Sequence, residues 1–173
     1  KTNRQTLSCK PEAYMTLDLA IPKVTSVTLE DCFEEYCKFE VMEDDNAWFN
    51  EKTNKKEDVN KGIQFWNLPK ILIVTLKRFD DITKKKKNLV TINDMNNINL
   101  SKHVVGYNKS SYIYELFGVC NHSGGLMGGH YTANIKKEDG KWYNYNDTNV
   151  DIISERKVIT TEAYCLFLKK KHM

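Results

Sequence analysis

Residues Asn121–Ala133 read NHSGGLMGGHYTA, a stretch that places two pairs of glycines directly before a histidine. Glycine pairs allow a backbone to approach a ligand closely or to adopt positive φ angles. The histidine, His130, opens a run of β-forming residues. We therefore interpret the stretch as a flexible loop that delivers a histidine to the start of a strand.

The next β-rich run along the chain, Trp142–Val150, reads WYNYNDTNV. A turn at Lys137–Lys141 would place the two runs on neighbouring strands and bring His130 close to Asn146. An amide that orients a histidine fixes the imidazole tautomer, and the other ring nitrogen can then take a proton from a thiol. A histidine beside glycines is by itself more often an ordinary loop residue. We give that interpretation to the other histidines, His103, His122 and His172.

The surrounding sequence predicts one helix and several strands. Tyr14–Ile21 alternates apolar and polar residues up to Pro22, the pattern of a half-buried strand. Thr28 and Asp31 form a capping-box pattern, so Thr28–Lys38 is predicted as a short helix. Further strands are predicted at Ile63–Trp66, Lys70–Arg78, Tyr112–Asn121, Tyr131–Lys136, Trp142–Asn146 and Ala163–Leu168. This order favours an α+β domain around an antiparallel sheet.

The remaining segments are predicted from their apolar content. Lys70–Arg78 is nearly continuous in apolar residues and is expected to be a central strand. Asn50–Lys61 is highly polar and is expected to be exposed, and Asp80–Asn99 has the weakest signal for order. Ser154–Val158 is predicted to form one turn of helix.

The composition fits a single intracellular domain. The net charge of +3 is too small for the basic footprint of a nucleic-acid-binding protein, and Lys84–Lys87 is interpreted as a solvated loop. The longest apolar run, Ile71–Leu76, is far shorter than the roughly 18 residues of a membrane span, and Lys1–Lys10 lacks the apolar core of a signal peptide. Five irregularly spaced cysteines argue against a disulfide framework. We expect a cytoplasmic or nuclear location, or both.

Several motifs of the sequence resemble motifs of the ubiquitin-specific protease family and occur in the same order. They are LPKILIVTLKRF (Leu68–Phe79), YELFGVCNHSGGLMGGHYTA (Tyr114–Ala133), WYNYNDTNV and AYCLF (Ala163–Phe167). Leu29–Trp48 also resembles the fingers region of that family, and the likeness extends from about Tyr14 to Lys169. The resemblance implies a papain-like cysteine protease fold, a hand built mainly of antiparallel sheet, here without the helical thumb. Residues 1–173 would be a single C-terminal portion of the catalytic domain, with fingers at about 1–67 and palm at about 68–171.

The resemblance also implies roles for named residues. His130 would be the general base and Asn146, the fourth residue after Trp142, its partner, with Asp147 in support. The loop would fold over the Gly-Gly tail of ubiquitin through Gly124, Gly125, Gly128 and Gly129. Tyr131 and Tyr145 are candidates for the wall of the tail channel, with plain sheet packing as the alternative.

The sequence departs from the family in its cysteines. The family nucleophile sits in a box of the type GNTCYMN, and the chain contains no such box. Each of its cysteines is expected to be a core residue or a bystander: Cys9, Cys32, Cys37, Cys120 and Cys165. We therefore expect the nucleophile to come from a segment outside this chain, and the chain alone to be inactive.

The zinc site that many members hold in their fingers is also predicted to be missing. It uses two CxxC pairs, and the later pair would fall on Asn50 and Thr53, which are not zinc ligands. We expect no metal and no other cofactor. The expected partners are ubiquitin, ubiquitinated proteins and the N-terminal half of the catalytic domain.

Two other functions stay open at this point. A non-catalytic ubiquitin-binding pseudoprotease or scaffold would keep the fold without the nucleophile, although it would not need the intact GGHYTA sequence. An unrelated β-rich binding domain would require the ordered motif matches to be coincidental.

Overall fold

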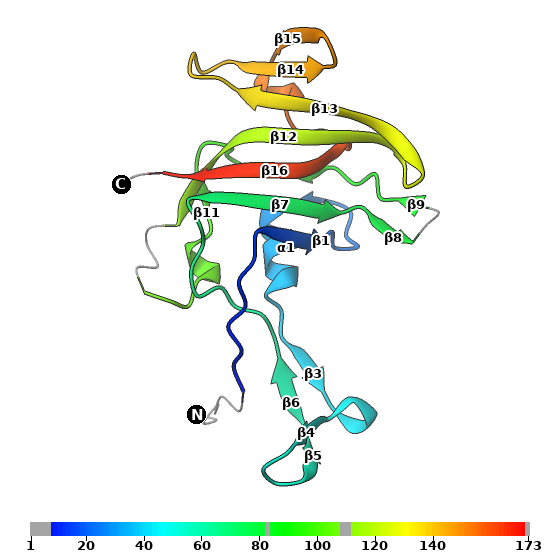
Figure 1. Ribbon diagram of the computed structural model, residues 1–173, viewed down its shortest axis with the longest axis vertical. Coiled ribbons are helices and arrows are strands. Elements are labelled where there is room, and N and C mark those ends of the chain that lie inside the picture. The colour runs from blue at the N-terminus through cyan, green and yellow to red at the C-terminus, as the bar shows by residue number, and fades with distance from the viewer. Residues whose placement is uncertain (1–7, 82–83, 108–111, 172–173) are drawn as a thin grey trace.

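The computed structural model describes residues 8–81, 84–107 and 112–171. A curved β-sheet forms the body of the molecule, and a narrow pair of hairpins projects away from it (Figure 1). Within these ranges the structure contains one α-helix, α1 (Leu29–Tyr36), which lies beside the sheet. No helix in the described part of the chain is long and apolar enough to cross a membrane.

The main sheet has eight strands. Seven of them follow one another in the order β1 (Thr16–Ala20), β7 (Ile71–Lys77), β16 (Ala163–Lys170), β12 (Ile113–Gly125), β13 (Gly128–Lys136), β14 (Trp142–Asn146) and β15 (Asn149–Ile153). The eighth, β11 (Ile98–Asn99), pairs with β12. Only the β1–β7 pair is parallel among the pairs of this sheet. The predicted α+β class with a mainly antiparallel sheet is confirmed.

Burial alternates along β7, so one face of this strand packs into the core. Leu72, Val74 and Leu76 are fully buried, while Ile71 and Lys77 are exposed. β7 pairs with β1 on one side and with β16 on the other, so its predicted central position is confirmed.

The helix α1 packs against the face of the sheet that carries Leu72, Val74 and Leu76. It buries Leu29, Cys32 and Phe33 in the core that the buried residues of β7 also belong to. Thr28 and Asp31 form the predicted capping box, in which the Asp31 amide donates to Thr28 Oγ1 (3.1 Å) and the Thr28 amide to Asp31 Oδ2 (2.7 Å). Such a cap satisfies two amides that the first helical turn leaves unpaired.

The polar stretch Asn50–Lys61 is mostly exposed, as predicted, and lies largely in the projecting hairpins. β3 (Glu40–Met42) pairs with β6 (Val59–Lys61), and β4 (Trp48–Asn50) pairs with β5 (Lys55–Glu57), so much of the polar stretch forms strands. The strand predicted at Ile63–Trp66 is wrong, because only Phe65 forms an isolated bridge, with Val104. The Phe65 ring instead packs into an aromatic cluster with Tyr14, Phe33 and Tyr36.

Short elements complete the fold. They are β2 (Val27–Thr28), β10 (Val90–Thr91), β8 (Phe79–Asp81), β9 (Lys84–Lys85) and the 3₁₀ turns Asp44–Asn46, Ser101–His103 and Glu155–Lys157. The last of these confirms the helical turn predicted at Ser154–Val158, whereas the described residues of Asp80–Asn99 form only two-residue strands and the end of β8. The division into fingers at 1–67 and palm at 68–171 stays a prediction.

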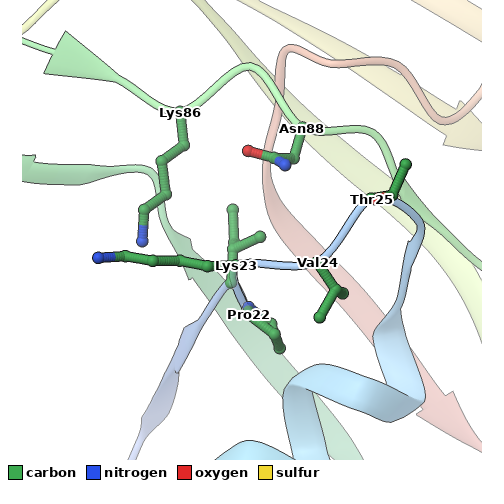
Figure 2. Close-up of a pocket in the computed structure, with 7 residues that line it drawn as sticks. Pro22, Lys23, Val24, Thr25, Lys86 and Asn88 are labelled. Carbon is green, nitrogen blue, oxygen red and sulfur yellow. The ribbon is translucent and has the colours of Figure 1, made fainter.

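An open cavity of about 490 Å³ lies between the β1–α1 connection and the segment after β9. The Lys23 and Lys86 side chains extend toward the same side of it (Figure 2). It shares no lining residue with the histidine site described next.

Candidate active site

The glycine-rich stretch is the end of a long β-hairpin. β12 and β13 stay paired from Gly118 opposite Ile135 as far as Gly125 opposite Gly128, and His130 lies opposite Ser123. The stretch predicted as a flexible loop is therefore mostly strand. Gly124 has a φ angle of 112°, a backbone conformation that residues other than glycine rarely adopt.

His130 and Asn146 meet across neighbouring strands. β13 and β14 pair around the predicted turn, and His130 Nε2 lies 2.6 Å from Asn146 Oδ1. An amide oxygen only accepts hydrogen bonds, so Nε2 carries the ring hydrogen in the neutral imidazole. Nδ1 is then the nitrogen that can accept a proton from another group.

Asp147 occupies a different position from its neighbour. Its Oδ2 lies 4.0 Å from His130 Nε2, beyond hydrogen-bond distance, and its side chain is 77% exposed. It sits in the two-residue turn between β14 and β15 with a φ angle of 51°. Aspartate tolerates this left-handed conformation better than most residues, which gives Asp147 a role in the turn.

His122 is a buried residue of the site, so its interpretation as a loop histidine is wrong. It lies in β12, is 5% exposed, and its ring centroid is 4.6 Å from that of Tyr131. A Cβ atom on Gly129 would lie 2.2 Å from His122 Nε2, so the ring packs directly against the glycine that precedes His130. Burial lowers the pKa of His122, and the adjacent Lys85 ammonium lowers it further.

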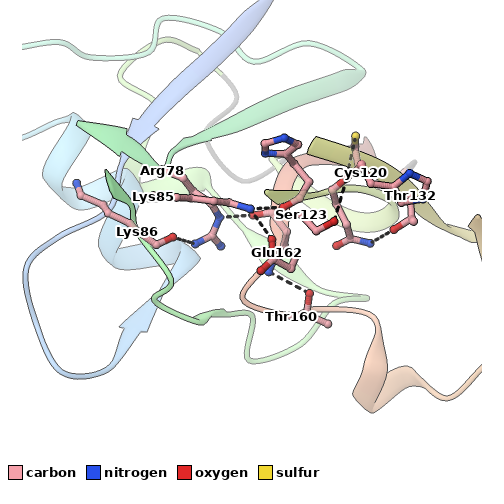
Figure 3. A network of polar contacts seen from close by, with 12 residues as sticks. Arg78, Lys85, Lys86, Cys120, Ser123, Thr132, Thr160 and Glu162 are labelled. Atoms are coloured by element: carbon pink, nitrogen blue, oxygen red, sulfur yellow. Dashed lines mark hydrogen bonds and ion pairs between the residues drawn. The ribbon is translucent and has the colours of Figure 1, made fainter. Parts of the chain in front are cut away.

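Lys85 connects β9 with β12 and with the segment before β16, and it extends toward Glu162 (Figure 3). Its Nζ atom donates to the backbone oxygen of His122 and forms an ion pair with Glu162, and its side chain is only 6% exposed. The His122 amide in turn donates to the Glu162 backbone oxygen (2.9 Å). The interpretation of Lys84–Lys87 as a solvated loop is therefore wrong for Lys85.

Arg78 extends this hydrogen-bond network to the end of β7. Its buried guanidinium donates from Nε to Ala163 O (2.6 Å) and from Nη1 to the carbonyl oxygens of Lys86 (3.0 Å) and Asn88 (2.9 Å). These contacts join the end of β7 to the start of β16 and to the segment after β9. Burial lowers the pKa of Arg78, and the negative charge of Glu162 opposes that effect.

A family model described as ubiquitin carboxyl-terminal hydrolase matches residues 3–168 of the sequence. The chain belongs to the ubiquitin carboxyl-terminal hydrolase family. The membership predicted from the motifs is confirmed.

Ubiquitin carboxyl-terminal hydrolase 10 of Arabidopsis thaliana is 36% identical over 168 residues, which cover 95% of this chain and 18% of that protein. Ubiquitin carboxyl-terminal hydrolase 15 of Homo sapiens is 33% identical over 163 residues, which cover 92% of this chain and 17% of that protein. The chain thus spans about a sixth of the length of these relatives.

Solved structures of the family share the fold. The SAGA deubiquitinase module of Ubp8, Sgf11, Sus1 and Sgf73 bound to monoubiquitin matches with a TM-score of 0.77 and 26% identity. The same module bound to ubiquitin aldehyde matches with a TM-score of 0.76 and 26% identity. Each match covers 92% of this chain and 36% of the other. The predicted papain-like, ubiquitin-specific protease fold without a thumb is confirmed.

In this hydrolase-family chain the predicted channel glycines and Tyr131 lie in the β12–β13 hairpin, and Tyr145 lies on the neighbouring strand β14. Tyr131 is 56% exposed and its ring lies tilted against that of His122, whereas Tyr145 is half-buried on β14, with Lys137 Nζ 5.6 Å from its ring centroid. A channel wall and plain sheet packing are both compatible with these positions, so the roles of the tyrosines and glycines stay predictions.

The described cysteines have free thiols. Cys32 is buried in α1, Cys37 follows that helix, and Cys120 and Cys165 face each other across β12 and β16. Burial raises the pKa of Cys32 and of Cys37 to about 11.

No group of three or more histidine, cysteine or acidic side chains that could hold a metal ion occurs within the described ranges. Cys32 and Cys37 belong to α1 and the residue after it, and Cys9 is exposed in the segment before β1. The absence of a zinc site and of a cofactor stays a prediction.

Proposed function

We propose that the protein containing this chain is a thiol-dependent deubiquitinase. It hydrolyses the peptide or isopeptide bond after the C-terminal glycine of ubiquitin. The contact of 2.6 Å between His130 Nε2 and Asn146 Oδ1, at the end of a glycine-lined hairpin in a chain of this family, carries the proposal. The nucleophilic cysteine comes from a segment outside this chain.

In the proposed reaction His130 moves a proton in each half. Nδ1 takes the proton of the thiol, and the thiolate attacks the carbonyl carbon of the ubiquitin glycine. When the carbon–nitrogen bond breaks, Nδ1 returns that proton to the leaving amine and a thioester remains. Water then attacks the thioester and gives a proton to Nδ1, and the thiol recovers that proton as the ubiquitin carboxylate leaves.

Asn146 supports the base as a positioning residue. Its amide oxygen holds the Nε2 hydrogen and so directs Nδ1 toward the thiol. Because it is uncharged, it holds the ring without drawing off its proton. Asp147 is too far for a direct contact and supports the turn that carries Asn146.

Ubiquitin is the proposed substrate because of the glycines of the hairpin and the named relatives. A Cβ atom added to Gly125 or Gly128 would have no neighbouring atom within 4 Å, so the hairpin end presents open backbone that a two-glycine tail can approach. The Ubp8-containing modules that share this fold are described as bound to monoubiquitin and to ubiquitin aldehyde.

The thiols of the chain itself are poor candidates for the nucleophile. Burial raises the pKa of Cys120 and Cys165, and so disfavours the thiolate. Cys120 lies three residues before Ser123, the partner of His130, so it points to the opposite face of the hairpin. Cys32 belongs to the buried side of α1.

The proposal is tested with the full-length protein that carries this chain. It should hydrolyse ubiquitin-amidomethylcoumarin, and His130→Ala should lower kcat by about 10²- to 10⁴-fold, the usual contribution of a general base. Unchanged activity in that variant would show that His130 is not the general base. Binding of ubiquitin without any hydrolysis by the unaltered protein would instead favour a pseudoprotease.

A further inference from the structure

The position of His130 in β13 divides the site into two sides. The glycine hairpin precedes His130 along the strand, and Thr132 and Asn134 follow it on the same face of the sheet. If the ubiquitin tail lies against the glycines, the rest of the substrate must lie on the other side of His130. The general acid must also reach the leaving amine, so the residue that carries this amine lies close to His130.

A cavity of about 480 Å³ occupies that other side. His130 is part of its wall, and Thr132, Asn134 and Asn144 continue the wall along β13 and β14. The lining side chains are mostly uncharged amides and hydroxyls, which suits a peptide backbone and the polar end of a lysine side chain.

One buried group in this wall lacks a partner. Asn121 is 7% exposed and donates from Nδ2 to Thr132 Oγ1 (3.4 Å), while its Oδ1 atom has no hydrogen-bond partner among the described residues. A buried amide oxygen without a partner costs free energy, so this atom favours a ligand that brings a hydrogen-bond donor. An amine or a peptide N–H in the cavity would supply one.

The charges at the rim favour one kind of peptide. Arg156 and Lys157 line the cavity from the 3₁₀ turn Glu155–Lys157, and both side chains are exposed. The acidic residue of the lining, Glu162, is already paired with Lys85. The rim is therefore positive toward an incoming substrate.

We propose that this cavity binds the leaving-group side of the substrate, the modified lysine with its flanking target residues, and that Arg156 and Lys157 favour acidic residues beside that lysine. This inference rests on the proposed function and assigns a second binding region to the same site. Two exposed ion pairs that contribute about 0.5 kcal/mol each correspond to an expected preference of about fivefold in kcat/KM.

The test uses the full-length protein and two fluorescent peptides that each carry ubiquitin on a lysine through an isopeptide bond. One peptide has aspartates beside the lysine and the other has arginines. The unaltered protein should cleave the acidic peptide with a kcat/KM about fivefold higher than that of the basic peptide, and added salt at about 0.5 M NaCl should reduce the ratio. In the double variant Arg156→Glu and Lys157→Glu the preference should reverse.

Lys141→Glu is the matched control, because Lys141 is an exposed cation in the β13–β14 turn and does not line the cavity. It should keep the preference of the unaltered protein. Equal cleavage of the two peptides by the unaltered protein, or a preference that the double variant retains, would overturn the inference. Hydrolysis of ubiquitin-amidomethylcoumarin separates that result from failure of the proposed function, since inactivity toward this substrate would remove both.

Discussion

His130 Nε2 lies 2.6 Å from Oδ1 of Asn146 and 4.0 Å from Oδ2 of Asp147. The amide is therefore the partner of the imidazole, although a carboxylate stands next to it in the sequence. In the proposed reaction this neutral partner would hold the ring hydrogen, and the imidazole and the thiolate would carry the charges of the site.

Replacing these two residues should have different effects. Asn146→Ala should lower kcat of the full-length protein by on the order of 10²-fold, because the ring loses its fixed tautomer and orientation. Asp147→Asn preserves the turn and should change kcat by about twofold at most, the effect of a surface change of about 0.5 kcal/mol. Hydrolysis of ubiquitin-amidomethylcoumarin measures both. A larger loss in Asp147→Asn would make the carboxylate the functional partner.

Gly129 and Gly128 offer a matched pair for the packing of the hairpin. A Cβ atom on Gly129 would lie 2.2 Å from His122 Nε2 and 2.3 Å from Ser123 O, so Gly129→Ala should cost roughly 1–3 kcal/mol of stability. No atom lies within 4 Å of such a Cβ on Gly128, so Gly128→Ala should leave stability unchanged or raise it by up to about 1 kcal/mol. Urea unfolding measures the stability of both variants. Equal changes would show that the hairpin backbone shifts to accommodate the added methyl group at Gly129.

Lys85 should contribute far more to stability than its neighbour in sequence. Lys85→Met removes the donor to the His122 oxygen and to Glu162, which should cost about 1.5–3 kcal/mol for hydrogen bonds to a charged group. Lys84→Met, at an exposed position, should change the free energy of unfolding by less than about 0.5 kcal/mol. Chemical unfolding at low and high salt compares the two. If both variants behave as Lys84→Met is expected to, Lys85 is a solvated lysine after all.

Stability should fall in mild acid because of His103. Burial lowers the pKa of His103, and the neighbouring Lys102 ammonium lowers it further. The unfolded chain, with a histidine pKa of about 6.5, therefore binds a proton in a range of pH where the folded chain does not. The free energy of unfolding should decline as pH falls below about 6.5, by at most about 1.4 kcal/mol per pH unit for one proton.

The control for this pH dependence is His103→Phe, which keeps a ring against Phe33, whose centroid lies 5.5 Å from that of His103. Urea midpoints on either side of the histidine pKa, at about pH 7.5 and about pH 5.5, should differ less in the variant than in the unaltered chain. His122, whose pKa is also lowered, should account for part of the remaining difference. An identical decline in both proteins would exclude His103 as its source.

Local sequence patterns were sufficient to predict the segments that bury one face in the core. β7 and α1 follow their predicted ranges within three residues at each end, because the alternation of Leu72, Val74 and Leu76 and the capping box at Thr28 are encoded within a few neighbouring residues. The spacing from Trp142 also identified Asn146 as the partner of His130, through the resemblance to the family.

The strands of the projecting hairpins could not be predicted in this way. β5 and β6 are polar and mostly exposed, and a two-stranded hairpin with no buried face leaves no apolar alternation in the sequence. The opposite error occurred at Ile63–Trp66, where apolar residues suggested a strand. There the Phe65 side chain is buried by rings from other segments rather than by strand neighbours.

The surroundings of His122 depend on contacts between distant segments. Its ring lies near Phe79 and Tyr131, and its backbone meets Lys85 and Glu162. None of these partners is marked in the sequence around His122. Its burial follows only from the order of strands in the sheet, which periodicity along one segment does not encode.

The place of β16 in the sheet has a consequence for folding during synthesis. β16 is the last strand of the described chain, yet it lies between β7 and β12 and supplies hydrogen bonds to both. The strand pair β1–β7 and the meander β12–β15 therefore remain separate, each with an unpaired edge, until residues 163–170 leave the ribosome. We therefore expect insertion of this strand to be a late, non-local step that joins the two parts of the sheet, and a nascent chain stalled before it to expose two aggregation-prone edges.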